Sequence, residues 1–551
     1  MKKEMKRTAR LWMLFVVITL LVVGCTDDNI NPTTPEEPDE PEEVVKTASE
    51  VLKEIEGVSD IKEEKDEDGN SVTSFYFKQP IDHKNPAAGT FVQYCVLHYK
   101  GSKHTTVMHT HGYSITTSKN AKVRQLELAK ILDANYLAVE HRYYYRSIIG
   151  LTEEDTIKGI PSTKVQNEYW KYNTAEQSTA DLHNIVTALK ESGYFDGKWV
   201  SSGVSKNGIL TALYAYFYPN DMDVYVPFCA PFCDGAETTG IGKWLTNESG
   251  GKGTELQKDV WNVLERMTTD EDLREELVKL YKEEHGDDAK IQKYSTGTAM
   301  LALTYDYMAN MFYKFCYRPT DEWDDVIPDE NCSAELYYSF ITLGKTKYWD
   351  KLKNLRQLWD EEELKGDDDY EDEIDDDYEE EEDWDFDEDD DPMSSRRATS
   401  STWTLKFNGF LNTIYFVHAA KELGYFLYDW TILPENHVLT PSHVAWLKNK
   451  QTIKRFNRWY DVKYDDGKLM KSFLDFVKNN RNKDKCKMLF VYGGNDPWTG
   501  AAIPDPDKDD PCVKKYVVPN GTHNAFLTNS EYYRPEDKDY IINTVKEWLK
   551  D

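Results

Sequence analysis

Apolar and polar positions alternate along the first part of the chain in a way that predicts a β-sheet. Two runs rich in aromatic and β-branched residues, Ser71–Lys78 and Thr90–Tyr99, flank a turn rich in Pro and Gly and predict opening antiparallel strands. Shorter apolar runs at Thr105–Thr110, Tyr136–Val139 and Lys198–Ser202 predict further strands.

Helical periodicity separates several of these runs. Apolar residues recur at helical spacing in Val44–Ile55, Ala121–Leu132 and Glu176–Glu191. Strands that alternate with helices in this way indicate a mostly parallel sheet with helices on both faces. We therefore expect an α/β protein, with residues 44–231 as the first part of its main domain.

The strand pattern stops near Phe232 and resumes only near the C-terminus. Between residues 232 and 485 the periodicity is mainly helical, as in Lys258–Met267, Leu273–Glu283 and Ala299–Phe315. Residues 486–551 return to the α/β pattern, with a strand at Met488–Tyr492 and a closing helix at Ile541–Leu549. This order predicts a helical cap (residues 232–485) inserted into one α/β domain.

Charge is distributed unevenly along the 551 residues, whose formal net charge is -33. The segment 360–391, inside the predicted cap, holds 24 acidic residues and one lysine. Mutual repulsion and the shortage of core residues predict a disordered, solvated loop there. The acidic balance also argues against a nucleic-acid partner, because phosphate neutralisation requires clustered Lys and Arg.

The N-terminus has the features of an export signal. A basic stretch, Lys2–Arg10, precedes the apolar run Leu11–Val23, which is short for a membrane span. The run ends in VVGC, and this ending resembles the lipobox of bacterial lipoproteins, in which Cys25 would carry the lipid. We therefore expect a signal peptide at 1–24, a flexible acidic and Pro-rich tether at 25–43, and a lipid-anchored protein of the cell envelope, at the outer membrane with a periplasmic or surface-exposed location.

Candidate chemistry lies in three widely separated residues, each placed next to a predicted strand. Ser205 lies in GVSKNG, Asp496 in VYGGNDPW and His523 in NGTHNAF, just past the run Tyr516–Val518. The order serine, acid, histidine, with the serine on a strand-to-helix turn, is typical of the α/β-hydrolase fold. In such a site His523 would take the proton of the serine hydroxyl, and Asp496 would hold the imidazole.

The turn around the serine departs from the usual G-x-S-x-G pattern. Asn207 stands where the second glycine is expected, and Gly208 follows. Since Asn tolerates unusual backbone angles, we expect the turn to survive. The oxyanion would need two N–H donors, for which the backbone N–H groups of Lys206 and Tyr113 are the candidates.

Other polar residues carry weaker signals. His109 and His111 lie two residues apart with no carboxylate partner, so packing or hydrogen bonding is favoured over metal binding. No metal and no cofactor is expected. Cys486 and Cys512 flank the Asp496 loop, and a disulfide between them is left open.

Longer segments resemble a known family. FYFKQPIDHKNPAAGTFVQ, HTHGYS, NYLAVEHRYYYRS, WVSSGVSKNG, YGGNDPWTG and NGTH resemble the S37 family of secreted serine peptidases, which includes streptomycete tripeptidyl aminopeptidases. VEHRYY is also similar to the related S28 proline-specific exopeptidases.

The resemblance implies Ser205 as nucleophile, Asp496 as acid and His523 as base, and peptides as substrates, shortened by two or three residues at their free N-termini. Such a substrate needs a carboxylate for its ammonium group, and Glu140, Glu176 and acids of the cap are candidates. Glu140 is favoured instead as the structural partner of Arg142 in an ion pair. A serine esterase and a non-catalytic surface-binding lipoprotein are the alternatives to a peptidase.

Overall fold

The computed structural model describes residues 46–65, 69–115, 127–144, 146–149, 170–233, 235, 239–246, 255–286, 288–289, 291–317, 327–342, 414–415, 417–424, 433–434, 436–439, 441, 464–480, 486–519, 521–523, 527 and 533–550. Cys25 and the acidic loop 360–391 lie outside these residues. None of the helices in the described ranges is both long enough and apolar enough to cross a membrane.

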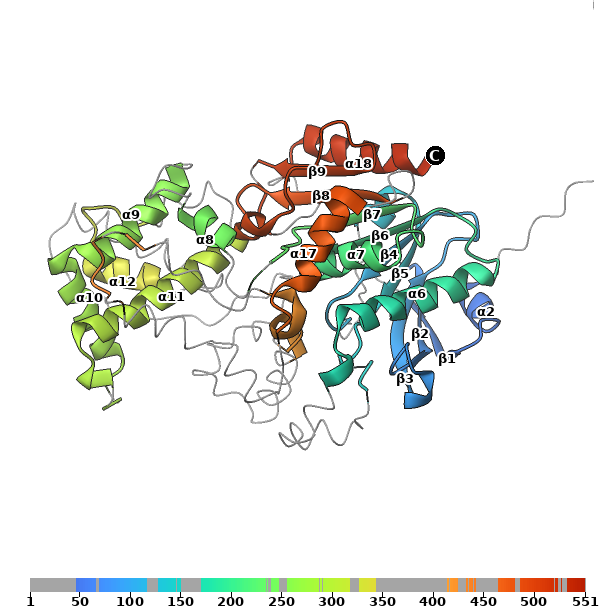
Figure 1. Ribbon diagram of the computed structural model, residues 1–551, viewed down its shortest axis with the longest axis horizontal. Coiled ribbons are helices and arrows are strands. Elements are labelled where there is room, and N and C mark those ends of the chain that lie inside the picture. Colours follow the sequence, from blue (N-terminus) through green and yellow to red (C-terminus); the bar gives the residue numbers. More distant parts are fainter. Residues whose placement is uncertain are drawn as a thin grey trace, which may run out of the picture. The chain divides into compact units, whose positions relative to one another are not determined.

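Nine strands of the described chain form one sheet in the order β1-β2-β3-β5-β4-β6-β7-β8-β9 (Figure 1). The strands are β1 (Val58–Lys65), β2 (Ser71–Pro80), β3 (Thr90–His98), β4 (Thr106–Thr110), β5 (Asn135–Val139), β6 (Trp199–Val204), β7 (Val224–Phe228), β8 (Lys487–Gly493) and β9 (Val513–Val518). The pairs β1–β2, β2–β3 and β3–β5 are antiparallel, and all pairs from β5–β4 to β8–β9 are parallel.

The helices are α2 (Ala48–Leu52), α3 (Glu127–Ile131), α6 (Ala175–Glu191), α7 (Lys206–Phe217), α8 (Thr239–Thr246), α9 (Glu255–Thr269), α10 (Glu271–Glu284), α11 (Thr296–Tyr317), α12 (Ala334–Thr342), α17 (Lys468–Asp475) and α18 (Pro535–Lys550). Short 3-10 turns are η1 (Pro86–Ala88), η2 (Trp170–Tyr172), η3 (Ile291–Lys293) and η11 (Pro497–Ala501), and π-helical turns are η8 (Ala419–Leu423) and η10 (Phe476–Asn480).

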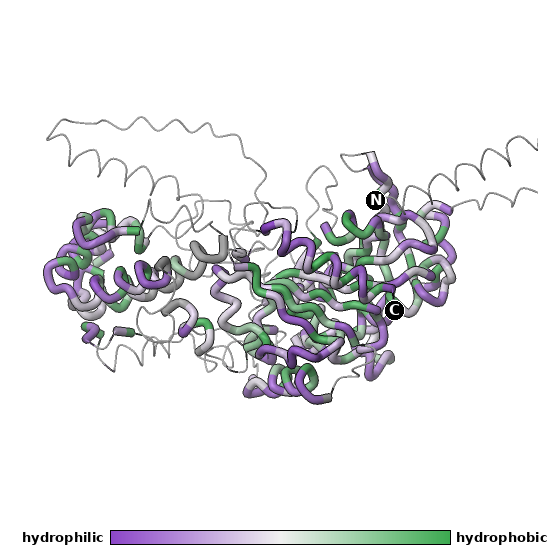
Figure 2. Tube along the Cα trace, turned by 90° about the horizontal axis from the view of Figure 1, so that it is seen from above, coloured by the Kyte–Doolittle hydropathy of each residue, from purple (hydrophilic) through white to green (hydrophobic). Residues whose placement is uncertain are grey.

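Alternate residues of the strands enter two different cores, one on each face of the sheet. Met488 and Phe490 of β8 pack with α6, α7 and α17, whereas Leu489 and Val491 pack with α3 and α18. The strands are therefore apolar along much of their length, as the green stretches of Figure 2 show. This arrangement confirms the predicted α/β class with helices on both faces.

A third core belongs to helices that come between β7 and β8 in the sequence. Helices α9 to α12 bury a cluster of their own that includes Leu277, Met300 and Phe340. Ala501, from the turn η11 that follows β8, belongs to the same cluster. The limits of the predicted cap stay a prediction, although the described part of residues 239–342 is helical apart from its connections.

Two strands of the sheet are absent from the predicted pattern. Strand β1 reads VSDIKEEK and is largely exposed at the sheet edge. Because most of its residues are charged, it lacks the alternation of apolar and polar residues by which a strand is recognised. Strand β7 is completely buried and short, and its apolar run continues into the following loop. The other predicted strands and helices occur in the described ranges, with ends that differ by a few residues. Residues 44–45 and 121–126, where two of the predicted helices begin, lie outside those ranges.

Candidate active site

Ser205 occupies a strained turn between β6 and α7. Its backbone angles are φ 59° and ψ -126°, a conformation that L-residues rarely adopt, and its N–H donates to Phe228 O at 2.9 Å. A Cβ added to Gly203 would lie 2.7 Å from Asn207, and one added to Gly208 would lie 2.6 Å from Phe228 O. The two glycines therefore let strand, turn and helix approach closely enough to present the serine.

Asn207 has a role other than the one predicted. It lies in the first turn of α7, and among the described residues the positive φ of this turn belongs to Ser205 alone. The turn survives as expected, but Asn207 does not absorb its unusual backbone angles, because the strain falls on the serine itself. Its side chain instead accepts a hydrogen bond from Gly112 N and lies with Nδ2 3.2 Å from His109 Nε2.

Asp496 and His523 form a buried pair at the carboxyl ends of β8 and β9. Asp496 Oδ2 lies 2.8 Å from His523 Nδ1, and the two side chains are 0% and 3% exposed. Asp496 also accepts from Trp498 N at 3.1 Å, a bond that holds the acid on the first turn of η11. Strand and turn thus position the acid, and the acid orients the imidazole.

Cys229 connects this pair to the serine turn. It follows β7 with a φ of 45°, directly after the Phe228 carbonyl that binds Ser205 N. Its Sγ, a carboxylate oxygen of Asp496 and a ring nitrogen of His523 all lie within 4.8 Å of one another. Burial, and secondarily the Asp496 charge, raise the pKa of the Cys229 thiol well above its usual value, so it stays a neutral neighbour of the acid.

The loop after β4 lies against the first turn of α7. Lys206 Nζ donates to Gly112 O at 2.6 Å and lies 3.3 Å from Tyr144 Oη. Its ammonium group is also 4.8 Å from the ring centroid of Tyr113 and 5.6 Å from that of Tyr415. The predicted oxyanion donors, Lys206 N and Tyr113 N, thus come from two segments that touch.

His109 and His111 stack with ring centroids 3.9 Å apart. His109 Nδ1 lies 3.2 Å from Tyr136 Oη, and its Nε2 faces Asn207. Burial lowers the pKa of His109 well below its usual value and that of His111 to about 3. The two rings are therefore neutral packing and hydrogen-bonding groups near the loop.

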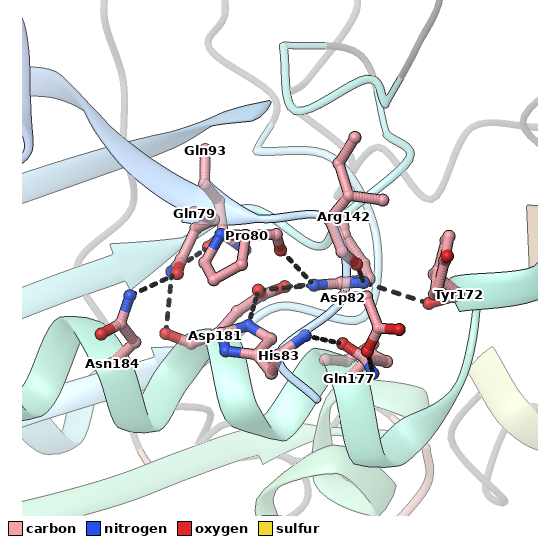
Figure 3. A network of polar contacts seen from close by, with 12 residues as sticks. Gln79, Pro80, Asp82, His83, Gln93, Arg142, Tyr172, Gln177, Asp181 and Asn184 are labelled. Atoms are coloured by element: carbon pink, nitrogen blue, oxygen red, sulfur yellow. Dashed lines mark hydrogen bonds and ion pairs between the residues drawn. The ribbon is translucent and has the colours of Figure 1, made fainter. Parts of the chain in front are cut away.

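The predicted ion pair between Glu140 and Arg142 is wrong. Arg142 instead binds Asp181 of α6 with two hydrogen bonds of 2.7 Å, and both side chains are fully buried (Figure 3). Arg142 also donates to the carbonyls of Pro80 and Ile81, so it ties the loop after β2 to α6. The partner of Arg142 is 39 residues away along the chain, and no local pattern points to it.

The two carboxylates predicted to receive a substrate ammonium are engaged elsewhere. Glu140 accepts hydrogen bonds from Ile115 N, Arg146 N and Ser147 Oγ. Burial raises its pKa to about 7, although these hydrogen bonds act in the opposite direction. Glu176 is exposed and pairs with Lys84 at 2.7 Å.

A partly buried carboxylate that the sequence did not single out lies at η8. Glu422 Oε1 accepts a hydrogen bond from Ala175 N at the start of α6 and lies 2.9 Å from His418 Nε2. Burial raises the pKa of Glu422 to about 7 and lowers that of His418 well below its usual value. Nothing in the local pattern of AAKELG distinguishes this glutamate from a surface residue.

The sheet, the serine turn between β6 and α7, and the acid and histidine after β8 and β9 define an α/β-hydrolase. Residues 40–238 match the family described as PS-10 peptidase S37, which confirms the resemblance predicted from the sequence. The match covers less than half of the chain.

One curated relative and two solved structures illustrate the likeness. A prolyl tri/tetrapeptidyl aminopeptidase from Streptomyces mobaraensis is 31% identical over 169 residues, which is 31% of this chain and 31% of the relative. A proline iminopeptidase from Mycobacterium smegmatis aligns over 86% of this chain and 99% of its own, with 10% identity and a TM-score of 0.31. A hydrolase of the α/β fold family from Bacillus anthracis aligns over 84% and 95%, with 10% identity and a TM-score of 0.26.

The chain spans less than a third of the length of the curated relative that it matches. At such low TM-scores the two structural likenesses add nothing, so the fold class stands on the sheet order and on the serine turn.

Proposed function

We propose that this protein is a serine peptidase that removes short peptides, of two or three residues, from the free N-termini of other peptides. The observation that carries the proposal is the strained turn at Ser205, at the same edge of the sheet as the hydrogen-bonded pair Asp496–His523. The match of residues 40–238 to a peptidase family supports peptides as the substrate class.

In the proposed reaction Ser205 Oγ attacks the carbonyl carbon of the scissile peptide bond while His523 Nε2 takes the hydroxyl proton. Asp496 accepts the Nδ1–H of His523 and stabilises the imidazolium that forms. The backbone N–H groups of Lys206 and Tyr113 bind the negative oxygen of the tetrahedral intermediate. The C–N bond then breaks, the amine leaves with the proton from His523, and water releases the acyl group from Ser205 by the same steps in reverse.

Cleavage at a free N-terminus requires a carboxylate for the substrate ammonium. Glu140 and Glu176 are poor candidates because each already has protein partners. Glu422 is engaged in the same way, by Ala175 N and His418, so the other acids of the predicted cap remain. The name of the Streptomyces relative supports an exopeptidase of this kind.

The test is mass spectrometry of a peptide mixture incubated with protein that lacks residues 1–43, alongside its Ser205→Ala variant. We expect two- or three-residue fragments to be lost stepwise from N-termini only when Ser205 is present. Cleavage of short acyl esters without cleavage of peptides would show an esterase instead. Absence of any Ser205-dependent hydrolysis would favour a binding protein.

The proposal includes a lipid anchor at Cys25, which would hold the enzyme in the cell envelope. It is supported by the VVGC sequence after a basic and apolar N-terminus. Full-length protein made in bacteria should incorporate labelled fatty acid, and the Cys25→Ser variant should not. Equal labelling of both proteins would exclude this anchor.

A further inference from the structure

Two consecutive side chains after the nucleophile bind both polar groups of one glycine in the loop after β4. Lys206 Nζ donates to Gly112 O at 2.6 Å, and Asn207 Oδ1 accepts from Gly112 N. Gly112 directly precedes Tyr113, whose N–H is the candidate oxyanion donor. Both contacts come from the first turn of α7, next to Ser205.

Peptide geometry converts these contacts into an orientation for Tyr113 N–H. The carbonyl of Gly112 and the N–H of Tyr113 belong to one planar trans peptide, in which they point in opposite directions. A carbonyl held at Lys206 Nζ therefore directs the Tyr113 N–H away from the lysine. The bond from Gly112 N to Asn207 fixes the preceding peptide in the same way.

We propose that Lys206 and Asn207 are positioning residues that hold the loop at Gly112 so that Tyr113 N–H is directed at the oxyanion. This inference rests on the proposed serine hydrolase function and adds two residues to its site. Lys206 then has two separate tasks, since its own backbone N–H supplies one donor and its side chain orients the other. The reaction thus depends on side chains that do not touch the substrate.

The burial of Lys206 indicates that its ammonium group has a role that an apolar side chain could not fill. The residue is 2% exposed, although an apolar side chain of similar length would avoid the large desolvation penalty of a buried ammonium. The ammonium lies 4.8 Å and 5.0 Å from the ring centroids of Tyr113 and Tyr144, where cation–π attraction offsets part of that penalty. These contacts leave its N–H groups directed at Gly112 O and Tyr144 Oη.

The orientation of the Asn207 amide is defined by Gly112. The N–H of Gly112 can only donate, so the amide oxygen faces the loop and the amide nitrogen faces His109. The amide Nδ2 lies 3.2 Å from His109 Nε2, which then acts as the acceptor, and His109 Nδ1 lies 3.2 Å from Tyr136 Oη. The loop approaches both side chains closely, since a Cβ on Gly112 would lie 2.9 Å from both Asn207 Oδ1 and Lys206 Cγ.

The test measures how fast a fluorophosphonate probe labels Ser205, since phosphonylation places an oxygen in the same hole as hydrolysis. We expect Lys206→Met and Asn207→Leu each to slow labelling about 10- to 100-fold, as for partial loss of an oxyanion donor. In peptide hydrolysis the same variants should lower kcat with little change in KM. The double variant should lose less than the product of the two single losses, because both side chains hold the same loop.

Matched controls separate orientation from stability. Lys190 resembles Lys206, because it also donates to a backbone carbonyl and lies 5.3 Å from an aromatic ring centroid, that of Trp199. Trp199 is the first residue of β6, whereas the serine turn follows the last residue of that strand. Asn135 likewise binds backbone with both ends of its amide, at the first residue of β5. Lys190→Met and Asn135→Leu should lower the melting temperature and leave the labelling rate of the folded protein within about twofold.

Lys206→Arg provides a rescue, because it keeps a cation and a donor for Gly112 O. It should label faster than Lys206→Met. Labelling of Lys206→Met and Asn207→Leu at the wild-type rate, or slowing of all four variants in proportion to lost stability, would overturn the inference. If the wild-type protein itself fails to react while its Ser205→Ala variant behaves identically, the proposed function fails instead.

Discussion

At the scale of single residues, the stacked pair His109 and His111 makes stability depend on pH. Burial holds the pKa of His111 at about 3, whereas an unfolded histidine titrates near 6.5. Below pH 6.5 the unfolded chain therefore binds a proton that the folded chain does not, so the free energy of unfolding falls with falling pH. This loss of unfolding free energy is still incomplete at pH 5, because the pKa of His111 in the folded protein lies below 5.

We expect the wild-type protein to lose at most about 2 kcal/mol more stability than His111→Gln between pH 7 and pH 5. Urea unfolding of both proteins at the two pH values measures this difference. His104→Gln is a suitable control, because the His104 side chain is 38% exposed and binds Asp133 O through Nδ1 at 2.8 Å. Equal losses in wild type and His111→Gln would show that His111 is not held neutral by the fold.

Residue-level chemistry divides into a part that the sequence predicts and a part that it does not. Ser205, Asp496 and His523 can be picked out because each has a local setting, a strand followed by a turn of small residues. The contacts of Asn207 cannot, since they depend on how the loop after β4 approaches α7. Long-range packing, and not local propensity, determines what its side chain binds.

At the scale of elements, the buried pair Arg142–Asp181 joins the loop after β2 to α6 (Figure 3). His83 Nε2 lies 2.7 Å from the same aspartate, so one carboxylate serves two partners. The predicted strands and the helix at this place are correct, but the ion pair between them is not predictable from spacing. It connects the segments after β2 and β5 to α6, and these lie far apart in the sequence.

We expect Asp181→Asn to lower the free energy of unfolding by about 3 kcal/mol, because it leaves the Arg142 guanidinium buried without its counter-charge. Replacing Glu176, which forms an exposed pair with Lys84, by Gln should change stability by less than about 1 kcal/mol. Denaturant unfolding followed by fluorescence provides both values. Similar small changes for the two variants would mean that water reaches Arg142.

At the scale of the whole molecule, the helices between β7 and β8 contact the turn that follows Asp496, the proposed catalytic acid. Helix α8 packs on η11, where a Cβ added to Gly240 would lie 2.0 Å from Gly500 O. Phe232 N also donates to Ala501 O at 2.7 Å. The position of Asp496 therefore depends on helices that are distant in sequence and that have a core of their own.

This contact makes Gly240→Ala a sharp test, because helix propensity and packing predict opposite results. In an exposed helix the change would stabilise by about 1 kcal/mol. Here the new methyl group would push η11 away from α8, and we expect a loss of about 1–3 kcal/mol together with a clear fall in kcat. Gly286→Ala is the control, since its Cβ would meet Glu283 O at an ordinary 3.4 Å. A Gly240→Ala protein with higher stability and unchanged kcat would contradict this prediction. It would show that Asp496 keeps its position without the packing of α8, and that the helical region acts on catalysis only through access to the serine.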